Sequence, residues 1–154
     1  MPDRPALEAV LFDAGGTLVR LDFEWMSEWL ATRGLECLAA ALRRGEVEGR
    51  RQYDLSCAPP AGADHAPQPL GRAGDVRAYL GGMLEAALVP AALRSSAVVA
   101  FGARQRGPGL WTRPMEGARQ ALDGVAALGL RRAVVSNSDG RAEQHLRDCG
   151  VFEG

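Results

Sequence analysis

Two short apolar runs, each ended by a polar turn that contains glycine, lie near the two ends of the chain. Residues 9–12 (AVLF) run into residues 13–17 (DAGGT), and residues 132–135 (RAVV) run into residues 136–140 (SNSDG). A continuous apolar run that stops at a glycine turn is typical of a strand buried on both faces, as in a parallel sheet between helices. The pattern therefore predicts two such strands, far apart in sequence.

Helical periodicity surrounds the second strand. Before it, apolar residues recur at steps of three and four: Met115, Ala118, Ala121, Leu122, Val125, Ala126 and Leu128. This stripe predicts a helix, with Pro114 near its start and Gly129 as its stop. Residues 141–149 predict another helix, which ends at Gly150. Residues 113–150 thus show the order helix, strand, polar loop, helix, which is a piece of a βαβ architecture.

The segment between the two strands has a different pattern. Helical spacing of apolar residues is found in 22–52, 75–88 and 91–106, and a loop rich in proline and glycine occupies 58–74. We therefore predict an α/β domain with a parallel sheet and a helical insertion between its two strands.

Composition limits the function classes. Eighteen basic and nineteen acidic residues give a formal net charge of -1, which offers no electrostatic case for nucleic acid or an acidic membrane as partner. No apolar run approaches the roughly 20 residues of a membrane span. The three cysteines form no CxxC pair, which indicates reduced thiols in a soluble, cytoplasmic protein. Every basic residue is arginine, so lysine-dependent chemistry is excluded for this chain as written.

The two strand ends carry the candidate chemistry. Asp13 stands at the carboxyl end of the first strand, where open α/β sheets bind ligands, and Gly15 and Gly16 allow backbone N–H groups to approach an anion. A carboxylate beside a phosphate is unfavourable unless a cation lies between them or the carboxylate attacks phosphorus, which carboxylates do in known enzymes. Ser136 and Asn137 end the second strand and offer groups that hold a phosphoryl oxygen, helped by the dipole of the next helix. This pattern indicates half of a phosphoryl-transfer site.

These residues resemble a known family. Residues 11–18 (LFDAGGTL) resemble the first motif of the haloacid-dehalogenase-like hydrolases, most of which are magnesium-dependent phosphatases, and residues 134–137 (VVSN) resemble their second motif. The resemblance covers nearly the whole chain, and the helical insertion lies where that family places a cap. It implies an α/β fold, a Rossmann-like parallel sheet core with an inserted helical cap. Residues 1–19 and 110–154 would form the partial core, and residues 20–109 the cap.

The resemblance implies a role for each motif residue. Asp13 would be the nucleophile that forms an aspartyl-phosphate and a ligand of Mg²⁺, and the carbonyl of Gly15 would be a second metal ligand. Gly16 would allow the tight turn and offer an N–H to the phosphate, which Ser136 and Asn137 would also hold.

The chain departs from the family's pattern at one motif position and at its end. The family's usual side chain at position 15 is an aspartate that acts as general acid and base, worth typically 10²–10⁴-fold, and glycine cannot supply it. Family members that are dehalogenases also lack this aspartate, but no halide-binding residues are recognised here, so dehalogenation is not favoured. The third motif (a lysine, occasionally an arginine) and the fourth motif (acidic metal ligands) normally follow the point where this sequence stops. The interpretation is an N-terminal portion, truncated before the later core strands and inactive when isolated.

The leading hypothesis is a hydrolase of the phosphatase type that acts on a small phosphorylated metabolite and uses Mg²⁺. The alternative is a non-catalytic module on the same fold that binds phosphate or another protein. A lysine and an acidic pair beyond residue 154 would favour the enzyme. A dinucleotide-binding domain is less favoured, because no GxGxxG follows the first strand. The sequence leaves the substrate and the oligomeric state open.

Overall fold

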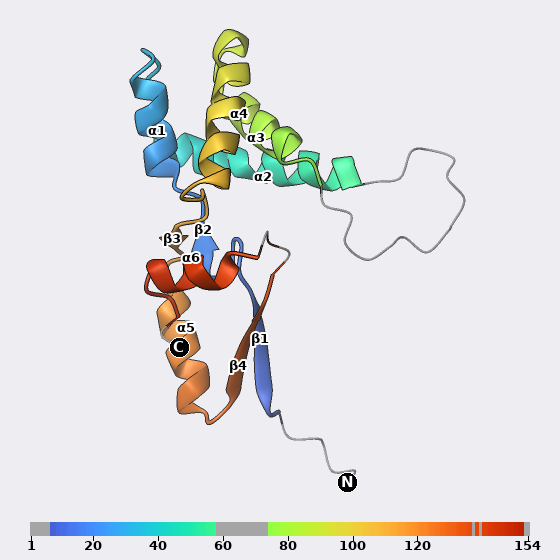
Figure 1. The fold of residues 1–154 in the computed structure, drawn as a ribbon, viewed down its shortest axis with the longest axis vertical. Coiled ribbons are helices and arrows are strands. Elements are labelled where there is room, and N and C mark those ends of the chain that lie inside the picture. The colour runs from blue at the N-terminus through green and yellow to red at the C-terminus, as the bar shows by residue number, and fades with distance from the viewer. Residues whose placement is uncertain (1–6, 58–73, 137, 139, 153–154) are drawn as a thin grey trace, which may run out of the picture. The chain divides into compact units, whose positions relative to one another are not determined.

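A computed structural model describes residues 7–57, 74–136, 138 and 140–152 (Figure 1). The described residues form a mixed α/β structure with six helices and a small parallel sheet. They fall into two compact units. We call Met1–Leu21 with Gly109–Gly154 the strand unit and Asp22–Pro108 the helical unit. The roles of core and cap that the sequence suggested for similar segments stay predictions.

The strand unit contains the two strands that the apolar runs predicted. β1 (Ala9–Asp13) pairs in parallel with β4 (Arg131–Val135), from Ala9 opposite Arg131 to Asp13 opposite Val135 (Figure 1). The parallel pairing of these two strands is therefore confirmed, across more than a hundred residues of intervening sequence.

The expectation that both faces of these strands are buried is wrong for the described residues. Phe12 and Val134 pack against the core of the strand unit. The neighbouring side chains point the other way, and Leu11 and Val135 are 68% and 60% exposed. Successive side chains of a strand alternate between faces, and a parallel strand is buried on both only where helices cover both. In the strand unit, packing from α5 (Ala118–Ala127) and α6 (Ala142–Asp148) reaches one face.

The two helices of the strand unit end where the sequence predicted. Gly129 and Gly150 follow α5 and α6, and both have positive φ, +73° and +68°. α5 begins later than its apolar stripe, because Met115 accepts a turn hydrogen bond of 3.1 Å from Ala118 N–H. Leu122 of α5 and Leu146 of α6 are buried together with Leu18, Val19, Ala118 and Val151, which form the core of this unit.

A second, two-stranded sheet was not predicted. β2 (Val19–Arg20) pairs antiparallel with β3 (Arg113–Pro114), and Met115 N–H extends the contact by donating to Leu18 O at 2.9 Å. Strands of two residues are too short to show a period of two, so the sequence pattern holds no signal for them.

The helical unit contains four helices: α1 (Phe23–Ala31), α2 (Ala39–Cys57), α3 (Val76–Ala86) and α4 (Ala91–Arg106). The bounds predicted for α4 are confirmed. The helical region predicted at 22–52 is two helices, because the chain turns at Gly34, where φ is +77°. The predicted loop at 58–74 lies outside the described residues except for Gly74.

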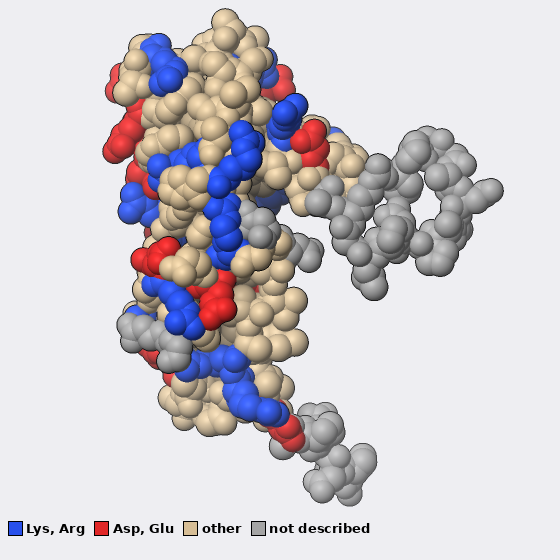
Figure 2. Space-filling view, in the orientation of Figure 1, with Lys and Arg blue, Asp and Glu red and all other residues tan. Residues whose placement is uncertain are grey.

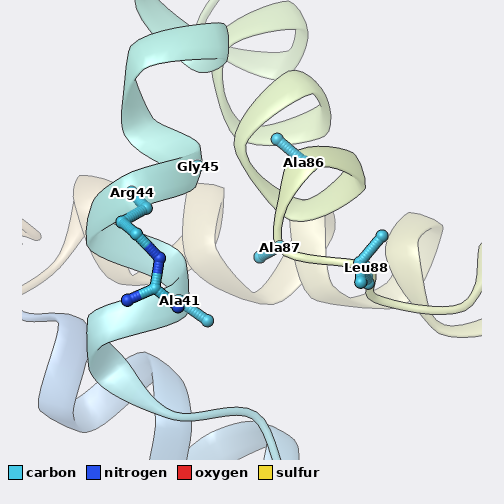
Figure 3. Close-up of a pocket in the computed structure, with 6 residues that line it drawn as sticks. All are labelled: Ala41, Arg44, Gly45, Ala86, Ala87 and Leu88. Atoms are coloured by element: carbon cyan, nitrogen blue, oxygen red, sulfur yellow. The ribbon is translucent and has the colours of Figure 1, made fainter.

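Close packing of α2 on α3 depends on glycine. A Cβ added at Gly45 would lie 2.5 Å from the carbonyl oxygen of Met83, and one at Gly49 would lie 2.7 Å from that of Tyr79. These distances bring the backbones of the two helices almost into contact. Figure 3 shows the end of this interface, where Arg44 and Gly45 of α2 face Ala86 and Ala87 across a hollow of about 190 Å³.

A partly buried ion pair joins the first and last helices of the helical unit. Asp22 is 4% exposed, and its Oδ1 accepts from Trp25 N–H at 3.2 Å as the N-cap of α1. Its Oδ2 accepts from Arg104 Nη2 at 3.1 Å, and the Arg104 guanidinium lies 4.1 Å from the centre of the Trp25 ring. The pair thus caps α1 and fixes the last turns of α4 beside it.

Replacing Asp22 with asparagine is expected to lower the free energy of unfolding by about 1 kcal/mol, because asparagine keeps the cap but removes the charged hydrogen bond. Urea unfolding followed by circular dichroism measures this. The matched control is Glu8→Gln, which breaks the exposed pair with Arg131 (3.2 Å) and should leave the midpoint unchanged. Equal effects of the two variants would contradict a stabilising role specific to Asp22.

Candidate functional site

The register of β1 and β4 brings the two sequence motifs together. Asp13 is the last residue of β1 and lies opposite Val135, and Ser136 follows directly after Val135. Both motifs therefore end at the same edge of the parallel sheet, where ligands of open α/β sheets bind. Asp13 is exposed and Ser136 is half-buried, so both side chains can reach solvent. Asn137 lies outside the described residues.

A tight turn follows Asp13 and is anchored in the core. The carbonyl of Ala14 accepts from the N–H groups of Thr17, Leu18 and Val19, at 3.3, 2.9 and 3.0 Å. Leu18 and Val19 are 1% and 3% exposed, so their burial holds the turn against the strand unit. This anchoring fixes the backbone that leaves Asp13.

Gly16 makes the turn possible, as predicted, because its φ is +81°, a conformation that side-chain-bearing residues rarely adopt. Its N–H, however, donates to Val19 O at 2.7 Å. In this conformation the N–H is engaged within the loop, so the geometry does not support the predicted phosphate contact of Gly16.

Gly15 keeps its own backbone groups out of the turn. It forms a parallel bridge with Val19, whose two hydrogen bonds come from the neighbours Ala14 and Gly16. The bridge therefore leaves the Gly15 carbonyl unused. On its Cβ side, Gly15 faces the ring of Trp111: an added Cβ would lie 3.6 Å from Cζ3 and 3.7 Å from Cε3.

The available donors suit a magnesium ion held by few protein ligands. Asp13 offers an exposed carboxylate and Gly15 a carbonyl oxygen, both hard oxygen ligands. Among the described residues, no three His, Cys, Asp or Glu side chains gather as a metal cluster. Mg²⁺ usually keeps several waters and binds through one or two carboxylates plus substrate phosphates, so this small donor set fits it better than a fully protein-bound metal.

Thiol chemistry is not favoured in the strand unit. Burial raises the pKa of the Cys149 thiol, and its Sγ lies 2.7 Å from His145 O. A raised pKa keeps the thiol protonated, whereas the thiolate is the nucleophile. His145 itself packs on Gly109, where an added Cβ would lie 2.8 Å from the imidazole, so this histidine has a packing role.

Charged side chains are mixed over the described surface, and two hollows lie in the helical unit. Figure 2 shows basic side chains on both units with acidic ones among them. The two hollows, of about 190 and 720 Å³, are both lined by residues of the helical unit, and neither includes Asp13 or Ser136. Within the described residues, no helix is long and apolar enough to cross a membrane.

Trp111 is a neighbour of the site that the sequence analysis did not connect with Gly15. It is half-buried beside β3, packs against the core of the strand unit and covers Gly15. Its separation from Gly15 by almost a hundred residues left no pattern by which the sequence alone could pair them.

Comparison with known proteins gives matches among solved structures only. No family model and no curated protein matches the chain. Among solved structures, it is similar to an L-2-haloacid dehalogenase from Xanthobacter autotrophicus, which has chloropropionic acid covalently bound. The sequence identity is 18% and the TM-score 0.45, over 96% of this chain and 54% of that one. The chain thus spans about half the length of this enzyme, which bears the name of the family that the two motifs resemble.

Proposed function

We propose that this chain carries the nucleophile half of a phosphatase-type hydrolase, which acts on a small phosphorylated metabolite through an aspartyl-phosphate at Asp13. The observation that supports this most is the parallel register of β1 and β4. In this register Asp13 lies opposite Val135, and Ser136 is the next residue of the chain, so an exposed carboxylate and a serine end neighbouring strands at one sheet edge.

Asp13 and Ser136, at the ends of the two strands, have different roles in the reaction. A carboxylate oxygen of Asp13 attacks phosphorus, and the bond from phosphorus to the leaving oxygen breaks with its electron pair on that oxygen. Ser136 donates a hydrogen bond to a phosphoryl oxygen and orients the group for in-line attack. Water then attacks phosphorus, and the bond from phosphorus to the Asp13 oxygen breaks with its electron pair on that oxygen. Phosphate leaves, the Asp13 carboxylate is restored, and the proton from the attacking water passes to solvent.

Magnesium belongs to the same proposal. Asp13 and the carbonyl of Gly15 would hold it, and bound Mg²⁺ neutralises charge between carboxylate and phosphate. The turn hydrogen bonds to the carbonyl of Ala14 fix the backbone between Asp13 and Gly15, which supports holding one ion with both residues.

The test uses the full product of the reading frame that encodes this chain. Hydrolysis of an aryl phosphate is measured with Mg²⁺ and again after chelation. We expect turnover that requires the metal. Binding of inorganic phosphate without any turnover would instead support the non-catalytic module and would overturn the enzymatic proposal.

Ser136→Ala is expected to lower kcat/KM for the aryl phosphate about tenfold, the cost of one hydrogen bond to a charged group. Ser138→Ala is the matched control, because Ser138 is exposed and its Oγ accepts from Gly140 N–H at 3.3 Å. Steady-state kinetics of both variants give the comparison. A loss as large in Ser138→Ala would exclude the specific role of Ser136.

A further inference from the structure

The indole of Trp111 occupies the space into which a side chain at position 15 would extend. The nearest ring atoms to an added Cβ are Cζ3, Cε3 and Cη2, at 3.6, 3.7 and 3.9 Å. A methyl group would make ordinary van der Waals contact there, and a longer side chain aimed along the same line would meet the ring. The Trp111 ring therefore lies in van der Waals contact with the first atom of any side chain at position 15.

The ring is held in this place by the fold of the strand unit. Leu110, just before Trp111, is 2% exposed. β3 begins at Arg113, two residues after Trp111. The Trp111 ring packs against the same core as Leu18 and Val19, which anchor the turn after Asp13. The aromatic surface and the candidate nucleophile are therefore carried by one packed region.

We infer that Trp111 determines substrate specificity by presenting an aromatic surface to the leaving group, so that the site takes aryl phosphates rather than alkyl phosphates. This inference rests on the proposed function. An aromatic leaving group stacks on indole, and aromatic pairs gain stability beyond the area they bury. Gly15 lacks the proton-donating aspartate that is usual at this position in the family, and the Trp111 ring provides an aromatic binding surface there instead.

The chemistry of the leaving group also favours aryl over alkyl phosphates at this site. When Asp13 attacks phosphorus, the bond from phosphorus to the ester oxygen breaks and its electron pair stays on that oxygen. An aryl oxide spreads this charge into its ring and leaves without a proton, which it takes from solvent afterwards. An alkoxide needs a proton as it leaves, and general acid help is worth typically 10²–10⁴-fold.

Binding of two phosphonates tests the aromatic contact without requiring turnover. Calorimetric titration of the full reading-frame product, with Mg²⁺ present, compares phenylphosphonate with methylphosphonate. We expect phenylphosphonate to bind about tenfold more tightly, a gain within the range of aromatic stacking. Trp111→Ala should remove this preference, whereas Trp111→Phe should retain part of it.

The control is Trp29→Phe, because Trp29 lies in the helical unit and packs on Phe101 with ring centroids 5.4 Å apart. It should keep the full preference for phenylphosphonate. Circular dichroism checks that each variant is folded. If Trp111→Ala does not fold, Trp111→Phe alone tests the preference for phenylphosphonate.

The outcomes separate this inference from the proposed function. If neither phosphonate binds, the phosphate site itself fails and both proposals are overturned. If both phosphonates bind equally well, or the preference survives replacement of Trp111, only the specificity role is overturned.

A second measurement tests the contact between Trp111 and position 15 directly. Gly15→Asp alone should raise the hydrolysis of an alkyl phosphate less than it does together with Trp111→Ala, because the ring packs on the Cβ at this position. Combined with Trp111→Ala, it should raise alkyl phosphate turnover at least tenfold over Trp111→Ala alone. A gain of that size in Gly15→Asp with Trp111 intact would contradict the inference.

Discussion

Replacing Asp13 with asparagine is expected to lower Mg²⁺-dependent hydrolysis of an aryl phosphate by at least roughly 10³-fold, since removal of a nucleophile costs more than removal of any positioning group. The amide keeps the size of the side chain and its place at the end of β1, opposite Val135. It is a poor nucleophile and a neutral metal ligand. Initial rates at saturating substrate measure the effect.

Asp123→Asn is the matched control for this variant. Asp123 is an exposed carboxylate in α5, within the same unit, and it belongs to neither of the two sequence motifs. It should keep full activity. Turnover by Asp13→Asn that stays within tenfold of the unchanged protein would exclude Asp13 as the nucleophile.

Replacing Gly45 with alanine is expected to lower the free energy of unfolding by about 2–3 kcal/mol, the cost of overpacking a tight contact. The added Cβ would lie 2.5 Å from the Met83 carbonyl oxygen and 3.2 Å from Ala87 N. Both are backbone atoms, which cannot rotate away as a flexible side chain can. Relief therefore requires α2 and α3 to move apart along their shared interface.

Gly81→Ala provides the control on the neighbouring helix. Nothing lies within 4 Å of a Cβ added at Gly81 of α3. Alanine is the better helix former, so this variant should gain about 0.5–1 kcal/mol. If α2 and α3 approach this closely, chemical denaturation will show a lower free energy of unfolding for Gly45→Ala and a higher one for Gly81→Ala. Destabilisation of equal size in both would point to a general cost of alanine instead.

The sequence predicted the parts of the fold that have a repeating signal. The apolar run before Asp13 and the run before Ser136 predicted β1 and β4, and the parallel pairing joined them. Gly129 and Gly150 predicted two helix ends, because a helix stop often needs a left-handed residue. The same patterns assigned Asp13 and Ser136 to one candidate site.

The features that the sequence did not predict depend on contacts between distant residues. The glycines at 45 and 49 look like weak points of a helix until α3 is placed against them. Strands β1 and β4 were predicted to be buried on both faces, but each has one exposed face. An apolar run alone does not show whether helices cover one face of a strand or both. The Trp111 ring over Gly15 likewise has no local signature.

The most direct test of the central claim is to trap the phosphorylated aspartate. The full reading-frame product is mixed with an aryl phosphate and Mg²⁺, quenched with hydroxylamine and digested, and its peptides are analysed by mass spectrometry. We predict a hydroxamate at Asp13 that appears only with substrate and is absent from Asp13→Asn. A protein that turns over substrate yet carries no modification at Asp13, or carries it on another carboxylate, would contradict the proposed nucleophile.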